Sequence, residues 1–308
     1  MQPSGRQHTR WTIWAAFGGL CLLVSSSRLL PAVAADSTSA IAQQSCFYGV
    51  VAFFALMVAA RRLWNRTKQH ELLWLPLAGV SILLLGMPAV VSEWARDGLS
   101  DITQTALFAL VPFVVVAIAM GREPIAGEEF GVRRFFAPAL ASFGGVLLLL
   151  PFNFPVSARA RIMWGVLFAA TVLVGFASEW IYRLLRGFEM MEALFIVCLS
   201  NALFLAACGV AISPSTGSWS GASSLISLSS FCYLLELLLL VWLLREMHPV
   251  RLAARFLVVP LLAIVEGLII LRPAFTVRMA GGLILLAGGA GYLLFSKSRD
   301  SDAVLSIR

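Results

Sequence analysis

Two glutamates of the 308-residue chain lie inside long apolar stretches, Glu236 within residues 223–244 and Glu266 within residues 256–271. A carboxylate in hydrocarbon is costly unless it pairs with another group or faces a water-filled cavity. One interpretation is that both glutamates bind a polar substrate or a coupling proton in such a cavity. The other is structural: each pairs with an arginine or a backbone group, or is neutral and hydrogen-bonded. The sequence leaves both interpretations open.

The residues around Glu236 favour a polar face on one helix. Ser229, Tyr233 and Glu236 are spaced at i, i+4 and i+7, which places them on the same side of a helix. Such a stripe is expected to face a cavity, so Tyr233 joins Glu236 as a binding candidate. Asn201, near the centre of residues 190–212, is a further candidate, although asparagine also joins neighbouring helices by hydrogen bonds.

Two tryptophans and two prolines occupy matching places in the two halves of the chain. Trp14 and Trp164 are candidates for aromatic cavity walls, with interface anchoring or core packing as the alternative. Pro112 and Pro260 each remove a backbone hydrogen bond inside a predicted helix and favour a kink. Irregular backbone in a membrane is tolerated where it is buried or lines a cavity, so both prolines are candidate hinges.

Other chemistry is not indicated by the sequence. It has no phosphate-binding loop, no dinucleotide fingerprint and no His-Glu-x-x-His helix. The three histidines are far apart, and the five cysteines lie in apolar stretches without ligand spacing. We therefore predict no metal, no cofactor and no enzymatic activity. Glu179 and Arg183 are four residues apart and are expected to form a local ion pair.

The composition is that of a membrane protein. Apolar residues make up 60% of the chain, charged residues 13%, and the mean hydropathy is +0.89, whereas a soluble domain is about 45–50% apolar and about 25% charged. A membrane-crossing helix needs roughly 20 apolar residues. We predict an all-α, polytopic membrane protein with ten transmembrane helices. Their approximate bounds are residues 11–29, 46–60, 72–92, 104–120, 137–153, 162–182, 190–212, 223–244, 256–271 and 279–296.

The positive charges predict the orientation. With the N-terminus in the cytoplasm, 17 of the 23 Lys and Arg residues, Arg255 among them, fall in cytoplasmic segments. This bias favours cytoplasmic N- and C-termini. We expect a multi-pass protein of a bacterial cytoplasmic (inner) membrane, with the net charge of +7 reflecting topology and no nucleic acid as partner.

An internal repeat divides the predicted helices into two sets of five. Ala-Leu-Val-Pro-Phe-Val at residues 109–114 matches Leu-Val-Val-Pro-Leu-Leu at residues 257–262. An odd number of spans in each half inverts the second half relative to the first. The predicted halves are residues 1–155 and 156–308. Small residues predict close packing of the fifth and tenth spans: Ala137, Ala141, Gly144, Gly145, Gly281 and Gly288.

The first span has a second interpretation. A basic head, an apolar run and Ala32-Val33-Ala34 are typical of a cleaved signal peptide. We expect the span to be retained because Trp14 matches Trp164 within the repeat. Cleavage stays an open alternative.

These motifs resemble those of EamA-type members of the drug/metabolite transporter superfamily. The resemblance rests on residues 105–112 (TALFALVP), 121–124 (GREP) and 144–148 (GGVLL), and on the second-half counterparts 258–260 (VVP) and 281–289 (GGLILLAGG). It implies ten helices in two inverted five-helix repeats around a central substrate cavity. It also implies transport of a small metabolite by alternating access, with proton coupling as an option.

The sequence departs from the family at one place that bears on function. Members often end the ninth span with Gly-Glu, where this chain has Leu271-Arg272-Pro273. The departure keeps a second function open, that of a non-transporting membrane assembly or regulatory protein with the transporter fold. The expected partners are a small-molecule substrate and the lipid bilayer, and homodimer formation is left open.

Overall fold

The computed structural model describes residues 9–29, 40–63, 73–121, 132–150, 157–212, 228–271 and 276–296. Helix is the only regular secondary structure in these residues, as predicted. The elements are α1 (Thr9–Leu29), α2 (Ala40–Leu63), α3 (Trp74–Ser81), the π-helix η3 (Ile82–Gly86), α4 (Met87–Ala95), α5 (Asp101–Phe108), α6 (Val111–Met120), the 3-10 helix η4 (Val132–Phe135), α7 (Phe136–Leu149), α8 (Ala158–Leu185), α9 (Met190–Ile212), α10 (Leu228–Glu246), α11 (Pro249–Ala253), α12 (Arg255–Leu271) and α13 (Val277–Phe295).

Seven helical runs in the described residues are long and apolar enough to cross a membrane. They are Ile41–Ala59, Trp74–Ala95, Asp101–Met120, Ala158–Leu185, Met190–Ala211, Pro249–Ile269 and Val277–Phe295. A shorter apolar helix covers Trp11–Ser26. Because a helix satisfies its own backbone hydrogen bonds, it suits such sequences in a bilayer. The chain therefore has the character of a multi-pass membrane protein.

Hydroxyl side chains begin three of the helices. Ser100 caps α5, Ser157 caps α8 and Thr276 caps α13, each by accepting a hydrogen bond from a backbone N–H three residues further on. The first N–H groups of a helix have no partner within it, so these caps fix where the apolar runs start.

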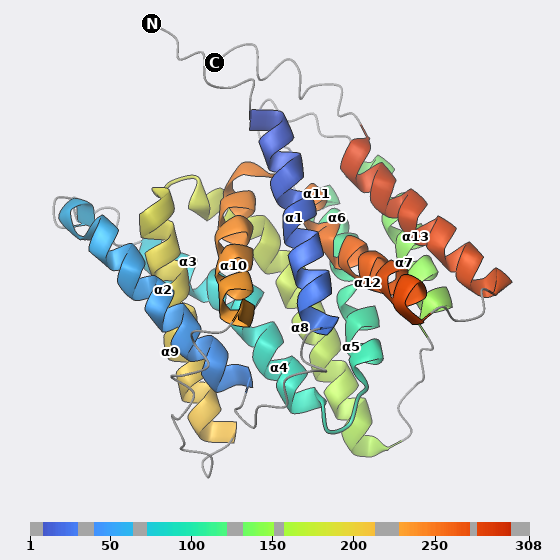
Figure 1. The fold of residues 1–308 in the computed structure, drawn as a ribbon, viewed down its shortest axis with the longest axis horizontal. Helices are drawn as coiled ribbons and strands as arrows, with labels where there is room; N and C mark the ends of the chain where they lie inside the picture. Colours follow the sequence, from blue (N-terminus) through green and yellow to red (C-terminus); the bar gives the residue numbers. More distant parts are fainter. Residues whose placement is uncertain are drawn as a thin grey trace, which may run out of the picture.

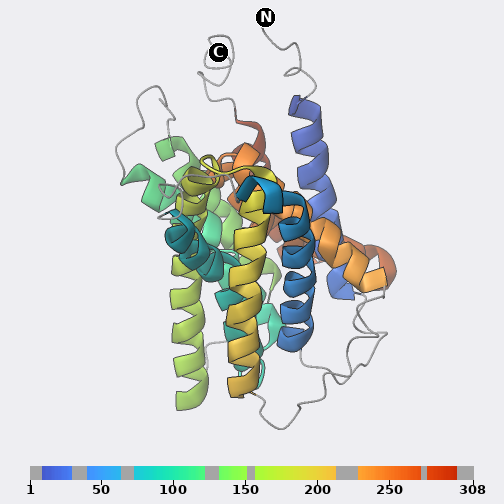
Figure 2. The same cartoon turned by 90° about the vertical axis from the view of Figure 1, so that its left-hand side faces the viewer.

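Two helix pairs form the flanks of the molecule. α2 packs along α9 on one side, and α7 packs along α13 on the other (Figures 1 and 2). Between the flanks, α8 contacts α3, α4 and α6, while α1 contacts α10 and α12. The largest apolar cluster occupies this central region, and a smaller one lies beside the start of α8 around Met163 and Leu167.

Glycines set the distance between α7 and α13. A Cβ atom on Gly145 would lie 2.8 Å from the Gly282 carbonyl oxygen, and one on Gly289 would lie 2.5 Å from the Pro138 carbonyl oxygen. The predicted close packing is therefore present, but its register in the tenth span was wrong. Gly281 and Gly288 have open space around them, because the helix turns Gly282 and Gly289 toward α7.

Three irregular segments interrupt the helices near the centre. η3 widens the helix between α3 and α4, a turn separates α5 from α6 at residues 109–110, and Ala254 separates α11 from α12. Pro112 follows one break by two residues and Pro260 follows another by six. Such interruptions re-aim side chains that a continuous helix would direct elsewhere.

Candidate functional site

A cavity of about 280 Å³ lies among seven helical elements at the centre of the molecule. Its walls come from α1, α2, η3, α4, α5, α10 and α12. Small-molecule sites commonly measure about 300–1,000 Å³, so its size suits a small metabolite. The lining residues are Leu20, Val24, Gln43, Gln44, Phe47, Tyr48, Leu84, Leu85, Pro88, Ala89, Thr105, Phe108, Tyr233, Glu236, Leu237, Leu240, Arg255, Phe256, Val259 and Pro260.

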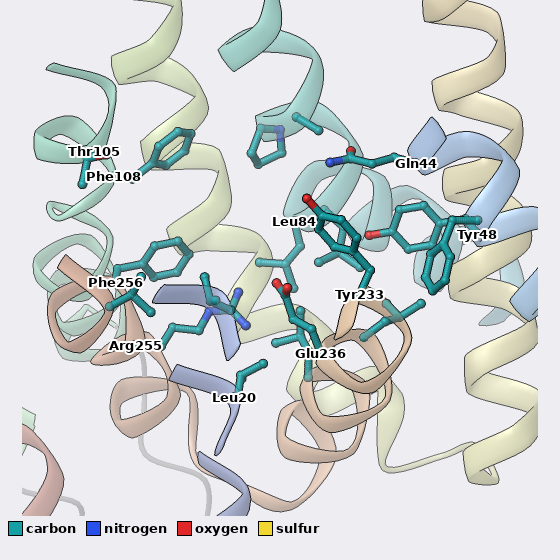
Figure 3. Close-up of a pocket in the computed structure, with 18 of the residues that line it drawn as sticks. Leu20, Gln44, Tyr48, Leu84, Thr105, Phe108, Tyr233, Glu236, Arg255 and Phe256 are labelled. Carbon is teal, nitrogen blue, oxygen red and sulfur yellow. The ribbon is translucent and has the colours of Figure 1, made fainter. Parts of the chain in front are cut away.

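Two opposite charges face this cavity. The Glu236 carboxylate comes from α10 and the Arg255 guanidinium from the first residue of α12, and the two point toward one another (Figure 3). Both side chains are partly buried. In surroundings of low polarity each charge lowers the cost of the other, so the pair can be kept ionised inside an otherwise apolar centre.

Hydroxyl and amide groups add neutral polar contacts. Tyr48 and Tyr233 direct their hydroxyls into the cavity, and the Gln44 amide lies beyond them (Figure 3). Thr105 lines the cavity from α5. These groups can donate and accept hydrogen bonds, which is what orients a polar ligand in a mostly apolar site.

Aromatic rings form two sides of the cavity. Phe108 of α5 stacks on Phe256 of α12, with ring centroids 6.5 Å apart and an interplanar angle of 22°. Phe47 of α2 contacts Tyr233 of α10 at a centroid distance of 6.5 Å. Each pair joins a helix of the first half of the chain to one of the second, so the apolar walls are shared between them.

Helix irregularities position several of the lining residues. Leu84 and Leu85 belong to η3, and Pro88 follows at the start of α4. π-helical turns occur often at functional sites because they shift side chains out of the regular α-helical register. The break at Ala254 similarly begins a new helix at Arg255.

Arg255 and Phe256 separate the cavity from a second, much smaller one. This space of about 10 Å³ lies among α8, α10, α11 and α12, and the same two residues line it. The Arg255 guanidinium carbon lies 4.8 Å from the centroid of the Phe256 ring, a cation–π contact that holds both side chains in place. Together they form the floor of the central cavity.

The predicted binding residues are divided between the cavity and the helix interfaces. Glu236, Tyr233 and Pro260 line the cavity. Glu266 is not among the lining residues. Its Oε2 accepts a hydrogen bond from Ser25 Oγ at 3.0 Å, which joins α12 to α1.

Asn201 lies in the interface between α9 and α3. Its side chain is fully buried, and Nδ2 donates to Ser81 Oγ at 3.2 Å and to the Val197 carbonyl at 2.8 Å. Its Oδ1 has no hydrogen-bond partner in the described residues and faces Gly86 of η3. Asn201 therefore supports the π-helical wall from behind.

The tryptophans and the remaining proline also lie away from the cavity lining. Trp14 stacks on Phe295 of α13 with centroids 5.4 Å apart, and Trp164 stacks on Phe168 within α8 at 5.7 Å. Pro112 is buried in the first turn of α6, where its missing N–H leaves no helical hydrogen bond unmade.

The sequence predicts Arg255 in a cytoplasmic loop. In the structure it begins α12 and faces the cavity. One signal in the sequence could have identified it: Leu-Ala-Ala precedes Arg255 and Phe-Leu-Val-Val follows it, so the charge is flanked by apolar residues on both sides. Thr105, Gln43 and Gln44 were missed for a similar reason, since each lies near the start of an apolar run.

Within the described ranges, no group of three or more His, Cys, Asp or Glu side chains is close enough to hold a metal ion.

Comparison with known proteins bears on the fold. No family model matches the chain, and no curated protein matches it. A solved crystal structure is similar with a TM-score of 0.68, over 94% of this chain and 98% of the other, at 14% sequence identity. At this identity the likeness concerns the fold alone.

Proposed function

We propose that this protein is a secondary transporter of the drug/metabolite type that moves a small metabolite across the cytoplasmic membrane by alternating access. The observation that carries the proposal is the central cavity, in which Glu236 and Arg255 face one another among long apolar helices. Buried charges of this kind in a membrane protein mark a pathway for a polar or charged solute.

The helix packing supports two inverted halves of five spans each, residues 1–155 and 156–308. In span order, the second (α2) pairs with the seventh (α9), and the fifth (α7) with the tenth (α13). The first (α1) contacts the eighth (α10) and ninth (α12), and the sixth (α8) contacts the third (α3 with α4) and fourth (α6). Exchanging the halves maps the first two of these pairs onto themselves and the contacts of α1 onto those of α8, as expected of a two-fold repeat.

The position of the cavity supports alternating access. With the N-terminus inside, the lining residues Gln43, Gln44 and Thr105 lie near the outer ends of their spans, while Arg255 and Phe256 lie toward the inner end of theirs. The floor formed by these two residues closes the inner side. Rocking of the halves would open the small space beneath the floor and close the outer side, which would move a bound solute across the membrane.

Proton coupling is an optional part of the proposal. Glu236 is its first candidate because it faces the cavity, where water and substrate reach it. Glu266 is its second candidate, and its hydrogen bond to Ser25 between helices makes a structural role the competing explanation.

Reconstitution into proteoliposomes tests the proposal. Vesicles with the purified protein are incubated with a broad metabolite mixture with and without a pH gradient, and solutes taken up are identified by mass spectrometry. We expect at least one metabolite to be accumulated, and Glu236→Gln to reduce its flux or remove its pH dependence. The Glu93→Gln variant is the matched control, because Glu93 pairs with Arg96 at a more exposed site outside the cavity.

Two results would count against the proposal. Transport that is unchanged in both Glu236→Gln and Glu266→Gln would exclude proton coupling through these acids. No flux and no ligand-induced thermal shift with any metabolite would favour the non-transporting membrane assembly or regulatory protein.

A further inference from the structure

We infer that the cavity selects a zwitterion, a small molecule with a carboxylate and an ammonium group close together on an apolar body. The inference rests on the proposed function, since it names the solute that the same cavity would carry. It follows from the charges, the aromatic walls and the size of the cavity.

The first step is the charge balance. Among the described lining residues, Glu236 and Arg255 are the only ones with a formal charge at neutral pH, and the two charges cancel. A singly charged ligand leaves one charge in excess in a largely apolar centre. A zwitterion leaves the site neutral, so that every charge has an opposite partner.

The second step is the geometry of recognition. The planar Arg255 guanidinium matches a carboxylate, to which it can donate two parallel hydrogen bonds. It is held against the Phe256 ring, which keeps it oriented before ligand arrives. The Glu236 carboxylate can accept hydrogen bonds from an ammonium group. Tyr233 lies one helical turn away on the same face, and its hydroxyl points into the cavity.

The third step concerns the rest of the ligand. Phe47 and the stacked pair of Phe108 and Phe256 line the walls, with leucines between them. They offer an apolar surface rather than further charges. A cavity of about 280 Å³ limits the body to a small aromatic or branched aliphatic group.

The competing explanation is that Glu236 and Arg255 serve only each other, so that the ligand is uncharged or carries one charge. The two explanations differ in which ligand each variant prefers. Arg255→Gln removes the carboxylate partner alone, and Glu236→Gln removes the ammonium partner alone. The Glu93→Gln and Arg96→Gln variants change the same residue types in an ion pair outside the cavity.

Binding to the full-length protein in nanodiscs, measured by calorimetry at pH 7, tests the inference. The probes are phenylalanine, leucine and valine, each with its amide, which is a cation, and its N-acetyl derivative, which is an anion. We expect at least one amino acid to bind the unmodified protein about 30-fold or more tightly than both of its derivatives. Arg255→Gln should make the amide bind at least as tightly as that amino acid, because the ligand carboxylate then has no charged partner, and Glu236→Gln should do the same for the N-acetyl form.

The outcomes separate the inference from the proposed function. If no amino acid binds more tightly than its singly charged derivatives, the inference is wrong, while uptake of another metabolite in the proteoliposomes leaves the transporter proposal standing. If a preference for the zwitterion persists in both variants, Glu236 and Arg255 do not select the ligand and the inference is also wrong. Zwitterion-selective binding without flux of that amino acid in either direction supports the inference and contradicts the transporter proposal.

Discussion

In the α7–α13 flank, the backbones approach until Gly145, Gly282 and Gly289 leave no room for a Cβ atom. Around the central cavity, seven elements stand far enough apart to enclose about 280 Å³, and two of them carry the opposite charges of Glu236 and Arg255. Close contact stabilises a membrane protein through van der Waals packing, and an open cavity gives up part of that packing. Changes in the flank should therefore alter the free energy of unfolding, whereas changes in the cavity should alter binding and flux.

The largest effect is expected from Gly289→Leu. The new side chain would overlap Ser142 and the Pro138 carbonyl oxygen, which forces α7 and α13 apart. We expect a loss of roughly 3 kcal/mol or more in the free energy of unfolding, since overpacking a tight contact typically costs about 1–3 kcal/mol and here the obstacle includes backbone. Denaturant unfolding in detergent micelles measures it.

Gly288→Leu is the matched control for this change. The neighbouring residue has open space around it, so the free energy of unfolding should change by about 0.5 kcal/mol or less. Equal losses in the two variants would show that the α7–α13 contact is not the reason for the destabilisation.

A histidine between α10 and α11 is expected to make stability depend on pH. His248 caps α11 because its Nδ1 accepts a hydrogen bond from the Val250 backbone N–H, with 3.3 Å between the two nitrogens. Burial, with Arg251, Arg186 and Arg183 nearby, lowers its pKa from 6.5 to about 4. Because the unfolded chain binds the proton more readily, this group should contribute about 3 kcal/mol of stability above pH 6.5, which is lost progressively as the pH falls toward 4.

His248→Asn provides the comparison for the pH profile. Asparagine retains a side-chain acceptor for the cap but does not titrate, so thermal melting between pH 4 and 7 should become flatter than in the unmodified protein. The ring of Tyr182 lies 5.8 Å from that of His248. An identical pH profile in the variant would mean that another group controls stability there.

A smaller effect is expected from Ser25→Ala. Ser25 donates to Glu266 between α1 and α12, outside the cavity lining. Its loss should cost about 1 kcal/mol of stability and reduce metabolite flux less than Glu236→Gln does. Flux assays in proteoliposomes decide the ranking, and a greater loss from Ser25→Ala would place Glu266 in the transport pathway.

The smallest effect is expected in the α2–α9 flank. Ser45 Oγ donates to the Ala202 carbonyl at 2.9 Å, and a hydrogen bond between membrane helices is worth about 0.6 kcal/mol on average. Ser45→Ala should lower the free energy of unfolding by about that amount. A loss as large as that of Gly289→Leu would show that the α2–α9 flank depends on this hydrogen bond as strongly as the α7–α13 flank depends on its glycine contacts.

The sequence predicted local features well because short-range physics controls them. Four-residue spacing brought Glu179 and Arg183 together, and their ion pair is present at 3.1 Å. The same helical spacing placed Tyr233 and Glu236 on one face, and both line the cavity. Features that depend on how a helix is rotated against a distant partner were less predictable. The packing glycines Gly282 and Gly289 differ from the predicted pair by one residue.

Arg255 shows why the composition of the cavity could not be predicted from the sequence. An arginine at the edge of an apolar run is compatible with a cytoplasmic loop, where the charge meets water. It is equally compatible with a cavity, where the charge meets an acid from another helix. Only the break at Ala254 and the packing of α12 against α1 decide between them.

The sequence by itself determined the all-helical, membrane-embedded character, because the hydrophobic effect and backbone hydrogen bonding act on each apolar run separately. The tertiary structure alone decided which polar residues meet. It brought Glu236 to Arg255 and Ser25 to Glu266 over long separations in sequence. Two acids that look alike in the sequence thereby face different surroundings, because charge pairing depends on distances that only the packed helices define.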